Sequence, residues 1–412
     1  MRPLELAQAE VLATVPPLPT ARVSVFDAVG LVLAEAVTAP HDVPPFTNSA
    51  MDGYAVKAED VAHVPVTLPV IEDVAAGHVA AVGVSSGEAI KIMTGAPLPA
   101  GADTVIKVED TEPGDASVVI KASAPRGTAV RVAGGDVRAG ELVFAARARI
   151  TARHCAVLAS LGVSPLVARR PTVAILSTGD EVLEPSHDSL APGQIRDTNR
   201  PLLAALLSEF GADVLDLGIV GDDAGALRAA LQRGASEADA VLTSGGVSMG
   251  EYDLVKQVLS ELGDIGLWRV AMQPAKPFAF GLINGVPLFG LPGNPVSVMV
   301  AFEQFARPAL LHMMGALHIY RPRVTGVMSD GATTDPAKTV FLRAAVDWSG
   351  DRPVAELSGG QASNVLSALA GADAFAVVPR GRDDVAPGSD VALEMFTWPE
   401  NRSASDAGVD LV

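Results

Sequence analysis

An alternation of strand-like and helix-like segments over residues 170–321 constrains the fold of this chain more than any other feature. Short apolar runs at 173–176 and 286–291 predict buried strands. The segment 202–210 between them places its leucines on one face, which predicts a helix. Strands that alternate with helices are joined by right-handed crossovers, so we predict a mostly parallel, doubly wound sheet.

One loop of this region, residues 243–256, reads TSGGVSMGEYDLVK and lies between a predicted strand and a predicted helix. Glycines let backbone N–H groups approach a ligand, and a helix N-terminus attracts anions. We therefore predict a phosphate-binding loop, and the alternative is a tight turn that binds nothing. Asp253 and Lys256, which follow the loop, favour a binding site. The predicted loop contacts come from Ser244, Gly245, Gly246, Ser248 and Gly250.

Acidic residues follow several of the predicted strands, at the sheet edge where open α/β sheets bind ligands. Carboxylates beside a phosphate-binding loop suit Mg²⁺, which takes oxygen ligands and bridges to substrate phosphates. The alternative for the aspartates at 197, 222 and 223 is that they cap the helices that follow. The acidic residues are Asp180, Glu181, Asp197, Asp222, Asp223 and Asp253.

Two further loops at predicted strand ends offer groups that bind anions. Lys276 stands between two prolines, which restrict the backbone around it, so its ammonium group can neutralise a nearby phosphate. Residues 291–297, LPGNPVS, follow a strand and begin the last helix of the region, where N–H groups face an anion. The loop residues expected to hold the ligand are Thr178, Gly179, Pro292, Gly293, Asn294 and Pro295.

Composition narrows the possible partners. A net charge of −18 over 412 residues argues against nucleic acid, because DNA-binding proteins carry basic patches. A small anionic ligand would need local cations to offset that charge. The single cysteine, Cys155, excludes an internal disulfide and fits a reducing cytoplasm, and the seven histidines lack zinc-site spacing. No apolar run reaches the roughly 18–20 residues that span a bilayer, so we expect no membrane insertion.

The rest of the chain predicts further segments around the α/β region. Residues 1–41 and 142–169 are expected to form a helical stem, with one helix near the N-terminus and another over 25–37. Residues 42–141 read as a β-rich insertion, and 322–398 as a small β-barrel. The α/β domain covers 170–321, and the polar tail 399–412 is expected to fray.

Seven sequence blocks resemble the MoeA family of molybdopterin molybdenumtransferases, which includes the E domain of gephyrin. They occur in the family's order over roughly residues 1–400. The blocks are PPFTNSAMDGYAV (44–56), KIMTGAPLPAGADTVI (91–106), LSTGDEV (176–182), GQIRDTN (193–199), TSGGVSMGEYD (243–253), QPAKPFAFG (273–281) and LPGNPVS (291–297).

The resemblance implies an enzyme that inserts molybdate into adenylylated molybdopterin and releases AMP with Mg²⁺ present. It implies a cytoplasmic homodimer whose cleft lies beside the α/β domain and is completed at the dimer interface. The implied fold is a MoaB-like doubly wound α/β domain with a helical stem, a β-rich insertion and a C-terminal β-barrel. Each of these segments matches one read from the residues themselves.

The resemblance also assigns individual residues. The implied cleft residues are Asp52, Thr94, Asp136, Glu181, Asp222, Asp253 and Lys276, and the residues near molybdate are Pro292, Pro295, Arg343 and Ser363. The residues expected to hold the metal are Asp136, Asp180, Glu181 and Asp253.

Two positions depart from the family pattern, and these departures keep other functions open. Ala275 replaces the glycine of QPGKPF, and Gly135 stands where many members have glutamate before Asp136. A methyl group at 275 is tolerated at negative φ and costs about 1 kcal/mol or more at positive φ. The alternatives are a gephyrin-like scaffold that binds a partner's peptide between the α/β and barrel domains, and a MoaB-like adenylyltransferase. Tungstate stays open as the oxyanion.

Overall fold

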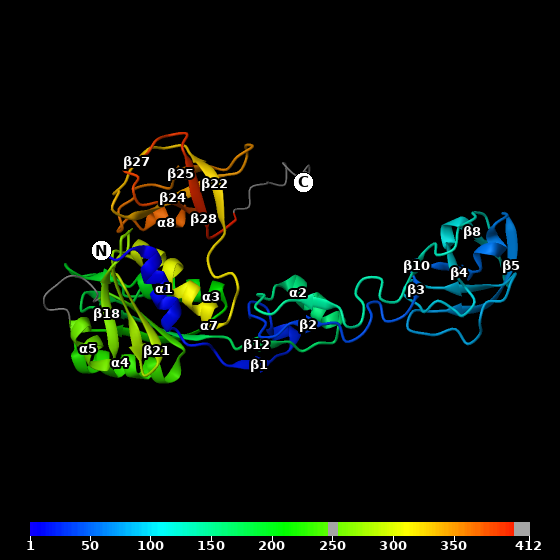
Figure 1. Cartoon of the computed structure of the whole chain (residues 1–412), viewed down its shortest axis with the longest axis horizontal. Helices are drawn as coiled ribbons and strands as arrows, with labels where there is room; N and C mark the ends of the chain where they lie inside the picture. The colour runs from blue at the N-terminus through cyan, green and yellow to red at the C-terminus, as the bar shows by residue number, and fades with distance from the viewer. Residues whose placement is uncertain (246–253, 399–412) are drawn as a thin grey trace. The chain divides into compact units, whose positions relative to one another are not determined.

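The computed structural model describes residues 1–245 and 254–398, with only the backbone for 254–256. The chain divides into two compact units (Figure 1). One comprises Met1–Ala21, Gly30–Ala34 and the chain from Leu166 onward, and the other comprises Arg22–Val29 and Glu35–Pro165. No helix in the described parts of the chain is long and apolar enough to cross a membrane.

The first unit contains a six-stranded sheet in the order β16-β13-β17-β21-β20-β18. The first four strands are parallel, and β20 is antiparallel to both of its neighbours. The strands are β13 (Thr172–Thr178), β16 (Asp213–Val220), β17 (Ala240–Ser244), β18 (Asp264–Arg269), β20 (Pro277–Ile283) and β21 (Val286–Leu291). This arrangement confirms the predicted doubly wound sheet.

Helices cover both faces of this sheet, which is why almost every residue of β13 is buried. On one face α4 (Ala224–Glu237) packs beside α5 (Leu254–Leu262) over a core that includes Leu176 and Val241. On the other face α3 (Asn199–Phe210) packs beside α6 (Pro295–Ala301). The last helix continues from α6 through a π-helical turn, η4 (Phe302–Ala306), into α7 (Arg307–Met313), and α1 (Leu4–Thr14) packs against this helix.

A closed five-stranded barrel follows in the same unit, as predicted. Strand pairs run from β22 through β25, β24, β26 and β28 back to β22. The ring strands are β22 (Arg323–Met328), β24 (Thr339–Asp347), β25 (Val354–Leu357), β26 (Ala374–Val378) and β28 (Asp390–Met395). Strand β19 (Met272–Gln273), which directly precedes β20, pairs with β24 and so joins the barrel to the α/β part.

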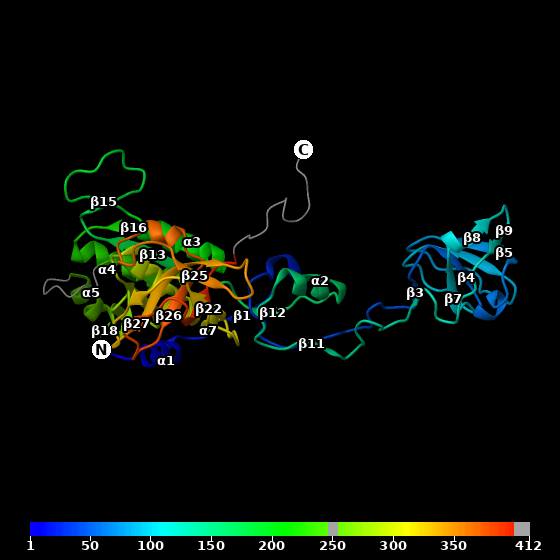
Figure 2. The ribbon, with the colours of Figure 1, turned by 90° about the horizontal axis from the view of Figure 1, so that it is seen from above.

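The second unit is built around another six-stranded sheet, in the order β7-β4-β6-β5-β9-β8 (Figure 2). Its strands are β4 (Gly53–Val56), β5 (Val66–Val74), β6 (Ala89–Ile92), β7 (Thr104–Lys107), β8 (Thr111–Pro113) and β9 (Ser117–Ile120). Helix α2 (Ala152–Ser160) belongs to this unit and lies within 142–169, where the sequence predicted helical structure.

The helix predicted over residues 25–37 is wrong. Only a single 3₁₀ turn, η1 (Val25–Asp27), forms in this stretch. Gly30 follows with a φ of +84°, which a right-handed helix cannot contain. Beyond it the backbone is extended: Leu33 forms a β-bridge with Val167, and the N–H of Ala34 donates to the carbonyl of Leu166. Pairing with a distant segment therefore overrides the local helical pattern.

Candidate functional site

The predicted loops of the α/β sheet meet at one edge. Parallel strands end on the same side, so β13, β16, β17 and β21 all present their C-terminal loops there. Strand β20 is antiparallel to β21, and its first residues therefore lie beside the end of β21. This register brings Lys276, just ahead of β20, to the edge that also holds Thr178, Ser244 and Gly293.

The first part of the glycine loop is tightly seated on β13. Ser244 ends β17, and its carbonyl accepts a hydrogen bond from Thr178 Oγ1 at 3.3 Å. Gly245 has a φ of +92°, and a Cβ there would lie 2.8 Å from Thr178 Oγ1. Only glycine fits this position. The other predicted loop contacts Gly246, Ser248 and Gly250, together with Asp253, lie outside the described residues.

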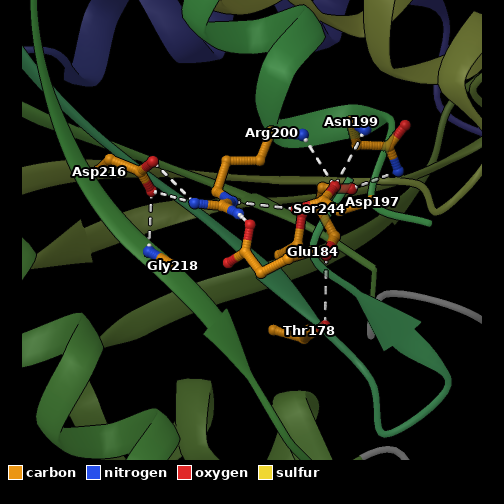
Figure 3. A network of polar contacts seen from close by, with 9 residues as sticks. Thr178, Glu184, Asp197, Asn199, Arg200, Asp216, Gly218 and Ser244 are labelled. Carbon is orange, nitrogen blue, oxygen red and sulfur yellow. Dashed lines mark hydrogen bonds and ion pairs between the residues drawn. The ribbon is translucent and has the colours of Figure 1, made fainter. Parts of the chain in front are cut away.

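Asn199, the first residue of α3, contacts Ser244 at the end of β17 (Figure 3) and also the loop after β21. Its Nδ2 donates to Ser244 Oγ at 2.6 Å and to the carbonyl of Gly293 at 2.7 Å. Its Oδ1 is buried and has no hydrogen-bond partner among the described residues. The sequence reasoning did not select Asn199, although it stands inside the GQIRDTN block.

An ion-pair network around the buried residues Asp197 and Arg200 holds the start of α3, where Asn199 lies (Figure 3). Asp197, which is 4% exposed, accepts hydrogen bonds from Ser177 Oγ and from the N–H groups of Asn199 and Arg200. Arg200 Nε donates to the other Asp197 oxygen at 3.0 Å, and the guanidinium also binds the carboxylates of Asp216 and Glu184. Burial alone lowers the pKa of Arg200, but these hydrogen bonds raise it above its ordinary value.

The acidic residues of the edge divide into two groups. Asp197 caps the start of α3, and Asp223 caps α4 by accepting a hydrogen bond from the N–H of Ala226. These two residues therefore act as helix caps, which was the alternative to metal binding. Asp180 and Glu181 are exposed, and neither forms an ion pair with a lysine or arginine of the described chain. Asp180 Oδ1 accepts the backbone N–H of Asp222 at 2.8 Å. Within residues 1–245 and 254–398 no three acidic, histidine or cysteine side chains form a metal-binding group.

The segment between β19 and β20 carries the altered glycine position. Ala275 is 3% exposed and has a φ of +68°, which is the conformation that costs an L-residue energy. The side chain of Lys276 is exposed. Its positive charge contributes to a lowered pKa of Asp335, after the hydrogen bonds from Lys338 and the N–H of Ala337.

The barrel places a buried arginine close to this edge. Arg343 on β24 is fully buried, and its Nη2 donates to the carbonyls of Gly360 and Ala362. Its Nε and Nη1 have no hydrogen-bond partner in the part of the chain that the structure describes, and burial lowers its pKa. The same loop reaches the α/β part, because Ser363 Oγ accepts a hydrogen bond of 2.9 Å from Asn294 Nδ2.

In the second unit, two predicted residues contact each other. Asp52 Oδ1 accepts hydrogen bonds of 2.7 Å from both the N–H and the Oγ1 of Thr94. These two bonds lower the pKa of Asp52 below its ordinary value of 3.8. Asp136 is exposed, and its N–H donates to the carbonyl of Val43 in the same unit.

Comparisons with known proteins show the family to which the chain belongs. Family models match over most of the chain: the MoeA N-terminal region (domain I and II) at residues 2–162, a probable molybdopterin binding domain at 174–312 and the MoeA C-terminal region (domain IV) at 325–396. The chain is 40% identical to Molybdopterin molybdenumtransferase 2 of Mycobacterium tuberculosis, covering 89% of this chain and 92% of that protein. It is 35% identical to the Molybdopterin molybdenumtransferase of Haemophilus influenzae, covering 96% and 99%.

Solved structures of the molybdopterin biosynthesis MoeA protein of Pyrococcus horikoshii match as well. One has a TM-score of 0.78 at 32% identity over 96% of this chain and 99% of that one, and another has a TM-score of 0.80 at 28% identity. The chain therefore belongs to the MoeA family of molybdopterin molybdenumtransferases. It is a transferase enzyme with a role in molybdenum cofactor biosynthesis.

Proposed function

We propose that this enzyme inserts molybdate into adenylylated molybdopterin and releases AMP in a Mg²⁺-dependent reaction. The observation that supports it best is Arg343, a fully buried guanidinium with two unpartnered nitrogens and no carboxylate partner in the described chain. A buried charge without a counter-charge is costly, so an anionic ligand is expected beside it. Molybdate is such an anion, and a guanidinium suits the oxygens of an oxyanion.

The loops next to Arg343 would hold the rest of the substrate. The contact between Asn294 and Ser363 joins the barrel loop to the loop after β21, so one ligand could contact both. At the sheet edge, Lys276 would neutralise phosphate charge. We assign the phosphate and pterin side to Thr178, Gly179, Ser244, Gly245, Gly246, Ser248 and Gly250, and the molybdate side to Pro292, Gly293, Asn294, Pro295, Arg343 and Ser363.

Asp180 and Glu181 fit a magnesium ion. Mg²⁺ is usually bound by one or two carboxylates, with waters and substrate phosphates filling the other positions. Both side chains are exposed at the sheet edge and lack a cationic partner in the described chain, which leaves them available to a cation. When bound, the ion supplies positive charge that polarises a phosphoanhydride. Asp136 and Asp253 are our further candidates as ligands.

The other proposed catalytic residues act through their charge. The contacts from Thr94 lower the pKa of Asp52, which favours the charged carboxylate and leaves it able to bind cations. Asp222 is positioned by its N–H bond to Asp180. We assign Asp52, Thr94, Glu181, Asp222, Asp253 and Lys276 to catalysis.

The test is AMP release from adenylylated molybdopterin with molybdate, with and without Mg²⁺. We expect Mg²⁺-dependent release that falls strongly in Asp52→Ala, Glu181→Ala and Lys276→Ala. Lys121→Ala, which removes an exposed ion pair with Glu112 in the second unit, is the control and should match the wild type. The assignment is wrong if all three site variants release AMP at the wild-type rate.

We also propose a cytoplasmic homodimer. Phe26 is 92% exposed and Val29 is 50% exposed, and side chains of this size are usually covered by a partner. Light scattering should give twice the monomer mass, and Phe26→Ser should shift the protein toward monomer. A monomeric wild type would contradict the dimer. Recovery of the protein with the cytoplasmic fraction tests the location.

Binding of a partner's peptide is the second candidate function. A cavity of about 490 Å³ lies between α3, α6 and the barrel. Leucine, methionine and phenylalanine side chains line it, with Glu209 and Arg321 supplying charge. Selection from a random peptide library should enrich sequences on the wild type but not on Leu206→Glu, a variant that places a charge in the cavity. Failure to enrich any sequence would argue against this function.

A further inference from the structure

Among the described residues, the side-chain amide of Asn199 has hydrogen-bond partners for its nitrogen but none for its oxygen. The residue is 9% exposed, and both hydrogens of its Nδ2 are used, toward Ser244 Oγ and the carbonyl of Gly293. Its Oδ1 is buried and accepts no hydrogen bond from residues 1–245 or 254–398. A buried acceptor without a donor costs stability, so a donor is expected to complete the site.

The orientation of this amide is fixed by chemistry. Amide oxygen and nitrogen are assigned from their surroundings, and a carbonyl can only accept. With the amide turned over, Oδ1 would lie 2.7 Å from the carbonyl oxygen of Gly293, and two acceptors would repel each other. The unpaired atom at this position is therefore an acceptor.

A hydrogen-bond acceptor can bind only those parts of an anionic substrate that carry a hydrogen-bond donor. Phosphate diesters and molybdate present acceptor oxygens, so neither can satisfy Asn199 Oδ1. Hydroxyl groups can donate to it, and so can the amino and ring N–H groups of heterocycles. Adenylylated molybdopterin carries an exocyclic amino group on each of its two heterocycles, the pterin and the adenine.

We propose that Asn199 is a specificity-determining residue that accepts a hydrogen bond from an exocyclic amino group of the substrate's heterocycle. The assignment rests on the proposed function, because it takes that function's substrate as the ligand. In this arrangement Nδ2 joins the end of β17 to the loop after β21, and Oδ1 binds the amino group of the ring. One side chain thus positions the backbone of the site through Nδ2 and distinguishes between ligands through Oδ1.

The experiment measures equilibrium binding of molybdopterin, AMP and molybdate to the wild type and to Asn199→Ala. Losing a hydrogen bond to a buried acceptor weakens binding by about tenfold. We expect that loss for molybdopterin alone if the pterin is read, or for AMP alone if the adenine is read. Molybdate should bind equally to both proteins, because it has no donor. Equal losses for all three ligands would mean that Asn199 only holds the loops, and would overturn the proposal.

A second measurement needs only the wild type and so does not depend on folding of the variant. Lumazine replaces the 2-amino group of pterin by oxygen, and inosine monophosphate replaces the 6-amino group of AMP. The wild type should prefer the amino form in one of these pairs by about tenfold, and Asn199→Ala should lose that preference. No preference in either pair overturns the assignment. A wild type that binds none of the three ligands refutes the proposed function itself, and this inference with it.

Discussion

Replacing Arg200 by methionine should destabilise the α/β part by about 3–5 kcal/mol, the cost of breaking a buried ion pair on one side. The side chain of Asp197 is 1% exposed and would keep its charge without the guanidinium. Asp216 and Glu184 are about half exposed, at 51% and 55%, so each of their pairs contributes at most about 1 kcal/mol. Most of the loss therefore comes from Asp197.

Urea unfolding followed by Trp268 fluorescence measures this effect, because Trp268 lies on β18 of the same sheet. Trp348 and Trp398 are first replaced by phenylalanine so that one probe reports. Arg233→Met is the matched control: its pair with Glu237 is exposed on α4 and should cost about 0.5 kcal/mol or less. Adding Asp197→Asn to Arg200→Met should restore part of the stability. The reasoning fails if Arg200→Met and Arg233→Met are equally stable.

Three smaller perturbations test other parts of the structure. Thr94→Ala should raise the pKa of Asp52 toward 3.8, as followed by carboxyl NMR during a pH titration. Because the contacts lower the pKa of Asp52 in the folded state, the stability that they supply is present above pH 3.8 and is lost as the pH falls through the folded-state pKa. An unchanged pKa of Asp52 in the variant contradicts the contact. Ala275→Gly removes positive-φ strain and should leave unfolding stability within about 0.5 kcal/mol of the wild type, whereas Ala279→Gly in β20 should cost about 1–2 kcal/mol. Asp180→Asn should raise the Mg²⁺ concentration for half-maximal AMP release about tenfold, and an unchanged requirement would remove Asp180 from the metal site.

Periodicity in the sequence predicted most of the regular structure. The apolar runs of β13, β17 and β21 stand out because helices bury both faces of the sheet. The helix over 25–37 was wrong because Leu33 is buried by pairing with Val167, and local periodicity contains no information about a partner so far along the chain. The four-segment division of the chain with its boundaries stays a prediction.

Sequence blocks located the candidate site loops but not the bonds between them. Asp52 and Thr94 come from different blocks, and their contact follows from strand register: Gly53 of β4 pairs with Ile92 of β6, which places the adjoining residues side by side. Asn199 and Arg200 were missed because their roles depend on Gly293 and Asp216, which the fold brings near. The D-x-x-R spacing from Asp197 to Arg200 at a helix start was the one local indication.

Two buried arginines of this chain differ in whether the protein itself neutralises their positive charge. Arg200 faces three carboxylates, so its positive charge is neutralised by the protein and holds the start of α3 in place. Arg343 is more deeply buried and contacts only carbonyls among the described residues, which offer no negative charge. Because the chain has a net charge of −18, an anion would bind most favourably beside a buried cation that contacts no carboxylate of the described residues. Residue type alone could not have distinguished the two arginines, since the difference lies in which groups the fold places around each guanidinium.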